Sequence, residues 1–164
     1  MNVPLRLGAL LLVVLMIQLT VFVDVRFLGV APELLSLVAI IGAFYVGPER
    51  GPVLAFGAGV VWDVYLPTPL GVTAITLAIA AYLVATLNEG LFHDTRSQLM
   101  LMVGLSSAGV VIGYALLGGI MGTPGLLQVE MFRIAVLVGL VNAALTPLAA
   151  PAMVWALGGE DAVR

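Results

Sequence analysis

The chain contains no cysteine, and all six of its lysine or arginine positions are arginine. Without cysteine it has no disulfide, no thiolate metal ligand and no thiol nucleophile. Its arginines are scattered, so no basic patch is available for nucleic acid or for anionic lipid headgroups. Charged residues make up only 9% of the 164 residues, against about 25% in soluble domains. The composition therefore excludes an ordinary soluble domain.

What the chain does contain is long apolar sequence. Hydrophobic residues make up 62% of it, and the mean hydropathy is +1.21. We interpret residues 1–164 as a single transmembrane domain of an integral membrane protein. Because about 20 residues are needed to cross a hydrocarbon core of about 30 Å, the charge-free runs predict an all-α bundle of six transmembrane helices. These runs are 7–23, 34–46, 51–66, 71–87, 99–120 and 134–157. The second and third are short, so five crossings are the alternative.

The arginines predict the orientation. Six crossings place both termini on one side, and with a cytoplasmic N-terminus four of the six arginines lie inside: Arg6, Arg50, Arg96 and Arg164. This asymmetry follows the positive-inside rule. The first helix is expected to stay uncleaved, because bulky residues stand where a signal peptide would have small ones. We therefore expect a multi-pass protein of the cell membrane with cytoplasmic termini.

Asp63 is the only charged residue between Arg50 and Glu89. A carboxylate at the centre of a membrane helix costs about 2.5–3.5 kcal/mol on insertion scales, so it usually has a partner, a cavity or a function. Asp63 lies one turn before Pro67, and in one interpretation it reaches the headgroup region and helps to end the helix. In the other, Gly59 on the same helical face lets a second helix come close enough to donate a hydrogen bond to Asp63.

Catalysis is not predicted. Acid–base or hydrolytic chemistry needs a second titratable group, a nucleophile or metal ligands, and the predicted spans offer Asp63 alone. His93, the only histidine, falls in a predicted cytoplasmic loop, and the Ser106-Ser107 pair has no base within helical reach. No phosphate loop, dinucleotide motif or zinc-ligand spacing occurs. We expect no enzyme activity, no cofactor and no metal site.

Other polar and small residues lie inside the predicted spans. Gln18 and Asn142 carry amides that are expected to bridge helices, the alternative being that they line a cavity shared with Asp63. The motif Gly109-x-x-x-Gly113 permits a close helix contact, either inside the bundle or with the single span of a partner.

The segment between Pro32 and Tyr82 resembles a known family. It has a proline at the start of an apolar helix, then a glycine-rich helix ending in an acid, then a short turn before the next helix: Pro32-Glu33-Leu34-Leu35, Gly57-x-Gly59-x-x-x-Asp63 and Leu70-Gly71. This order is similar to MreD, the small membrane subunit of the bacterial rod-shape system. Glu33 departs from the pattern of the family. The resemblance implies structural or partner-binding roles for Asp63, Gly57, Gly59, Pro69, Gly71 and Pro32.

The resemblance also implies a non-enzymatic scaffold in cell-wall elongation. MreD proteins act with MreC, a bitopic partner with a large extracytoplasmic domain, in the complex that connects cytoskeletal MreB to the RodA glycosyltransferase and its penicillin-binding partner. The family is similar in fold to the substrate-binding subunits of energy-coupling-factor vitamin transporters, so a small-solute transporter subunit is the alternative function. The first predicted helix lacks the Ala-x-x-x-Ala docking motif of such subunits, which disfavours that alternative.

Overall fold

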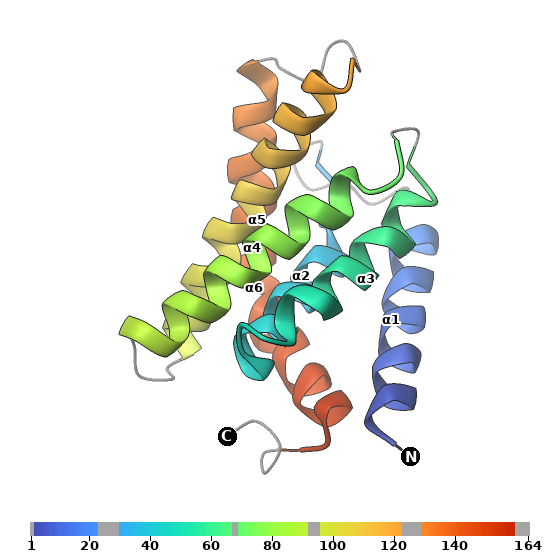
Figure 1. Cartoon of the computed structure of the whole chain (residues 1–164), viewed down its shortest axis with the longest axis vertical. Helices are drawn as coiled ribbons and strands as arrows, with labels where there is room; N and C mark the ends of the chain where they lie inside the picture. The colour runs from blue at the N-terminus through green and yellow to red at the C-terminus, as the bar shows by residue number, and fades with distance from the viewer. Residues whose placement is uncertain (1, 23–29, 67–68, 92–95, 123–128, 160–164) are drawn as a thin grey trace.

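The computed structural model describes residues 2–22, 30–66, 69–91, 96–122 and 129–159. Within these residues the chain forms six α-helices (Figure 1). They are α1 (Val3–Thr20), α2 (Leu34–Val46), α3 (Gly51–Asp63), α4 (Val72–Leu91), α5 (Arg96–Ile120) and α6 (Val129–Leu157). The prediction of an all-helical chain is confirmed, and α2 has the bounds that the charge-free run predicted.

Four of these helices, α1, α4, α5 and α6, are long and apolar enough to cross a membrane. The other two, α2 and α3, have 13 residues each. At a rise of 1.5 Å per residue such a helix is about 20 Å long, which is less than a hydrocarbon core of about 30 Å. The chain is thus a multi-pass membrane protein with four helices of spanning length, and six full crossings exceed what α2 and α3 reach by length alone.

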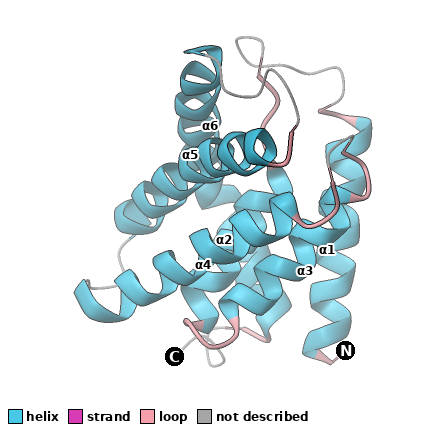
Figure 2. Ribbon diagram, turned by 45° about the horizontal axis from the view of Figure 1, so that its top comes forward, coloured by secondary structure: helices cyan, strands magenta, loops and turns pink. Residues whose placement is uncertain are grey.

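The short helix α2 occupies the centre of the bundle (Figure 2). It contacts α1, α3, α4, α5 and α6, and its ten consecutive residues from Leu35 to Phe44 are buried. A helix that is apolar all round, rather than along one stripe, suits a position enclosed by other helices. Burial inside protein also removes the need for this helix to match the bilayer thickness.

Two helical hairpins pack around α2. The first consists of α3 and α4, and the second of α5 and α6. The α5–α6 hairpin extends beyond the rest of the bundle at the end where α5 finishes and α6 begins (Figure 1). α1 lies against α2 and α6. Gly47, whose φ of 80° suits a residue without a side chain, ends α2 before the turn into α3.

The two ends of the chain's helical part lie at the same end of the bundle. In the first turn of α1, the Nη1 atom of Arg6 donates a hydrogen bond to the carbonyl oxygen of Trp155, in the last turn of α6, over 3.3 Å. The Arg6 guanidinium lies 5.6 Å from the centroid of the Trp155 ring. Such a contact is a favourable cation–π arrangement, and it places the start of α1 beside the end of α6.

Reporter fusions test the orientation. With a cytoplasmic N-terminus, four of the six arginines lie in the cytoplasm, as the positive-inside rule favours. A reporter fused after Arg164 and one inserted near Asn88 should therefore both report a cytoplasmic location. A reporter inserted beside Pro69 should report the outside. Paired phosphatase and fluorescent-protein fusions give this readout. An external C-terminus would contradict the orientation that the arginines predict, and termini on opposite sides of the membrane would contradict the shared end of α1 and α6.

Candidate functional site

The carboxylate of Asp63 holds the α3–α4 hairpin together. It lies in the last turn of α3 and is only 1% exposed. Its Oδ2 atom accepts hydrogen bonds from the backbone N–H groups of Gly71, at 2.7 Å, and Ala74, at 3.2 Å, and its Oδ1 atom accepts one from Thr73 at 3.1 Å. The first N–H groups of a helix have no partner within the helix, and they form the positive end of its dipole. Asp63 therefore caps the N-terminus of α4 from a different helix.

Gly59 lets the two helices of this hairpin approach each other. A Cβ atom added to Gly59 would lie 2.8 Å from the backbone nitrogen of Ala74, and the Cα atom of Ala74 would be closer still. Because real side chains do not fit into such a gap, α3 and α4 touch backbone to backbone here. Gly57 differs from Gly59, because it is exposed and a Cβ atom there would meet nothing within 4 Å.

The turn between α3 and α4 delivers the donors to Asp63. Gly71 has a φ of 102°, a left-handed conformation that favours glycine, and its N–H makes the shortest of the three hydrogen bonds to Asp63. Pro69 is exposed, and its carbonyl oxygen accepts a hydrogen bond from the Val72 N–H at 3.4 Å. Both residues serve the geometry of the turn.

A second polar cluster surrounds the start of α2. Gln18 of α1 donates from Nε2 to the carbonyl oxygen of Pro32 at 2.9 Å and accepts at Oε1 from the Leu34 N–H at 2.9 Å. One side-chain amide thus pairs with a backbone carbonyl oxygen before Glu33 and with a backbone N–H group after it. Pro32 itself is buried. Gln18 fixes the entry into α2, and in this way it joins α1 to the centre of the bundle.

Asn142 of α6 completes this cluster. Its Nδ2 atom donates to the hydroxyl of Ser107 on α5 at 3.0 Å and to the carbonyl oxygen of Glu33 at 3.3 Å. The hydroxyl of Thr146 donates to the carbonyl oxygen of Asn142 at 2.8 Å. The prediction that the amides of Gln18 and Asn142 bridge helices is confirmed. The alternative that they share a cavity with Asp63 has no support, because neither of the two cavities described below is lined by Gln18, Asn142 or Asp63.

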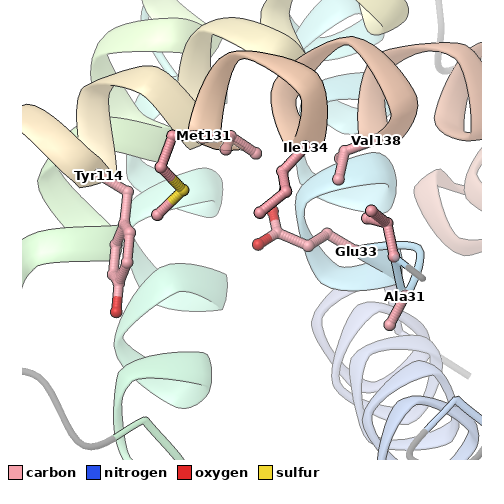
Figure 3. A pocket seen from close by; sticks show the side chains of 8 residues that line it. Ala31, Glu33, Tyr114, Met131, Ile134 and Val138 are labelled. Carbon is pink, nitrogen blue, oxygen red and sulfur yellow. The ribbon is translucent and has the colours of Figure 1, made fainter. Parts of the chain in front are cut away.

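The side chain of Glu33 borders a cavity of about 270 Å³. Its Oε2 atom accepts a hydrogen bond from the hydroxyl of Ser36 at 2.9 Å. Figure 3 shows the Glu33 carboxylate extending toward Met131 and Ile134 of α6, with the ring of Tyr114 of α5 on the other side of the space. The cavity is lined by Val30, Ala31, Glu33, Val111, Tyr114, Met131, Ile134 and Val138.

A larger groove lies between α4 and α5. Its volume is about 740 Å³, and its lining is almost entirely apolar. Gly113 of α5 packs against α4, since a Cβ atom added to it would meet the methyl group of Thr76. Gly109 of α5 instead faces open space in the groove. The motif Gly109-x-x-x-Gly113 therefore serves internal packing at Gly113 only.

The remaining sequence candidates have other positions. His93 lies outside the described residues. The hydroxyl of Ser106 donates to the carbonyl oxygen of Met102 in its own helix. Within the part of the chain that the structure describes, no group of histidine, aspartate or glutamate residues could hold a metal ion.

Sequence reasoning missed Glu33 and Tyr114 as residues of a common site. Glu33 stood out only as a departure from a family pattern. The available signal was a carboxylate placed directly between a proline and an uninterrupted apolar helix, where a flanking loop residue and a buried one look alike. Tyr114 gave no signal, since an aromatic residue in a membrane helix is ordinary.

Comparison with protein families gives a match over nearly the whole chain. The family model described as "rod shape-determining protein MreD" matches residues 2–154. No curated protein and no solved structure matches the chain. The expected likeness to the fold of energy-coupling-factor transporter subunits is therefore unsupported.

Proposed function

This chain belongs to the MreD family, and from that premise we propose that it is a non-enzymatic membrane scaffold of the cell-wall elongation complex. Membership implies a role in rod-shape determination, and MreD is a structural family. The match over residues 2–154, nearly the whole chain, is the observation that carries the proposal.

The proposed direct partner is a bitopic, MreC-like membrane protein. Through it the scaffold would connect to the wider wall-synthesis complex, which includes MreB, RodA and a penicillin-binding protein. The structure is consistent with this role. The buried polar side chains of Gln18, Asp63 and Asn142 hydrogen-bond to neighbouring helices and build a rigid bundle, and a rigid bundle suits a protein that positions other proteins.

Co-purification tests this proposal. The tagged chain is expressed in its own host together with the host's bitopic MreC-like protein, and it is extracted in a mild detergent. We expect the bitopic protein to co-elute in a fixed ratio, while a multi-pass membrane protein of unrelated function with the same tag retains none. Elution with an ATPase module or a bound vitamin, and without the bitopic protein, would contradict the scaffold function.

A further inference from the structure

The two short helices differ in what surrounds them. α2 is enclosed by other helices, so its length has no direct effect on the bilayer. α3 has the same 13 residues, but one of its faces is apolar and exposed. This face consists of Val53, Phe56, Gly57, Val60, Val61 and Val64. The bilayer beside α3 therefore meets an apolar helix that is only about 20 Å long.

Polar groups mark both ends of the exposed face of α3. Glu49 and Arg50, directly before α3, are exposed. After α3 comes irregular backbone, and in this turn Tyr65 is 52% and Leu70 is 71% exposed. The Asp63 carboxylate pairs with N–H groups of the turn, but it cannot pair with carbonyl oxygens. Irregular backbone that faces lipid does not occur in the hydrocarbon region. The turn therefore lies among the headgroups, where Tyr65 also suits the interface.

The course of α4 agrees with a short crossing at this hairpin. A Cβ atom added to Gly47, before α3, would lie 3.2 Å from the Oε1 atom of Glu89, near the end of α4. At the other end of the hairpin, Asp63 of α3 accepts a hydrogen bond from Gly71, directly before α4. The two helices thus connect the same two levels, although α4 has 20 residues and α3 has 13. The longer helix fits the same span by tilting, and α4 runs obliquely in Figure 1.

The helix α5 presents a longer apolar surface to the bilayer. Its exposed apolar side chains extend from Leu101 to Ile120, a distance of about 28 Å along the helix axis. This length nearly equals the hydrocarbon core of about 30 Å. The bundle therefore offers the bilayer two different hydrophobic lengths, one at α3 and one at α5.

We infer that the bilayer is thinned locally beside α3, so that this face is surrounded by lipids with short or compressed acyl chains. A bilayer thins around a hydrophobic surface that is shorter than its core, and α3 is shorter by about 10 Å. The lipids beside α5 keep their ordinary length. The inference goes beyond the proposed function and does not depend on it, because it concerns only the bundle and its lipids.

Fluorescence quenching by brominated lipid tests the inference on the purified protein. Both native tryptophans, Trp62 and Trp155, are replaced by phenylalanine. One new tryptophan is then placed on an exposed face, either by Phe56→Trp on α3 or by the matched Leu105→Trp on α5. Each variant is reconstituted in brominated phosphatidylcholine mixed with dimyristoleoyl, dioleoyl or dierucoyl phosphatidylcholine, whose acyl chains increase in length in this order.

The two tryptophans should report different lipid preferences. At Phe56→Trp, the short dimyristoleoyl lipid should displace the brominated lipid at least about twice as effectively as the long dierucoyl lipid, because each added ångström of mismatch raises the cost of contact. At Leu105→Trp this preference should be absent or reversed. The same preference for short chains at both positions, or none at Phe56→Trp, would show that α3 does not thin the bilayer.

Cysteine accessibility gives an independent measurement. Because the chain has no cysteine, Leu70→Cys in the turn after α3 and Leu105→Cys on α5 each carry a single thiol. In dioleoyl nanodiscs, which leave both membrane faces accessible, a membrane-impermeant maleimide should label Leu70→Cys and leave Leu105→Cys unlabelled. A folded Leu70→Cys variant that resists labelling would place the turn inside hydrocarbon of ordinary thickness, and the inference would be wrong. Circular dichroism and gel filtration show whether each variant is folded.

Discussion

Replacing Asp63 with leucine should destabilise the folded bundle by about 3 kcal/mol or more. Three N–H groups at the start of α4, two of them buried and that of Gly71 partly buried, would lose their acceptor, and each unsatisfied buried group costs about 1–3 kcal/mol. Asp63→Asn keeps one oxygen acceptor and should lose only about 1 kcal/mol. Unfolding of the purified protein in mixed micelles, as the fraction of dodecyl sulfate is raised, measures both changes.

The control for this experiment is the neighbouring Val64→Leu, since Val64 is 66% exposed on the outside of the bundle. It should unfold at the same dodecyl sulfate fraction as the wild type. Equal stability of Asp63→Leu and the wild type would show that the cap contributes nothing. The same substitution should improve the insertion of an isolated α3, because a carboxylate is removed; the gain should be below the about 3 kcal/mol of a central position, since Asp63 is the last residue of α3. Insertion and folding therefore respond to Asp63→Leu in opposite directions.

Gly59→Ala should lower the stability of the folded protein, whereas Gly57→Ala should leave it unchanged or raise it, although the two positions lie two residues apart on one helix. A Cβ atom at Gly59 collides with the backbone of Ala74, which cannot rotate away as a side chain does. We expect a loss of about 1–3 kcal/mol from overpacking. Gly57 faces open space, so Gly57→Ala should be neutral or stabilise α3 by up to about 1 kcal/mol. The same unfolding assay measures both variants.

The Gly59 effect should be coupled to Asp63. If α4 is pushed away at Ala74, its N–H moves out of reach of the Asp63 carboxylate, so the double variant Gly59→Ala with Asp63→Asn should cost less than the two single changes together. Strictly additive costs would mean that the close helix contact and the cap act independently. A Gly59→Ala variant as stable as Gly57→Ala would overturn the close packing itself.

Most of the helices could be predicted from the sequence because charge-free length is a strong signal in membrane proteins. The differences lie at the ends. α1 begins at Val3, before Arg6, and α6 begins at Val129, before Glu130 and Arg133. Arg6 and Glu130 lie in first turns and Arg133 lies just after one, and each of these side chains has a partner. A helix therefore continues past the charge that interrupts an apolar run. α3 ends at Asp63, since that residue caps the next helix.

The candidate site was only partly predictable. The spacing of Gly59 and Asp63 indicated a close helix and a hydrogen-bond donor, but it could not say that the donors are the backbone N–H groups of a particular turn. That result depends on the conformation of Gly71, which has no signature beyond glycine itself. The surroundings of Glu33 were equally hidden, because its carbonyl oxygen contacts Asn142, 109 residues later in the chain.

The central position of α2 has a consequence for how the protein is made. α2 is synthesised second, yet the residues that enclose it include α5 and α6, the last two helices. The carbonyl oxygen of Glu33 meets the Asn142 amide only after the first half of α6 has left the ribosome. Until then α5 and α6 have not both packed against α2, so its apolar surface must contact lipid or the insertion machinery. The core of this bundle is therefore the part that forms last during biogenesis, and a nascent chain that stops short of α6 would expose it to membrane proteases.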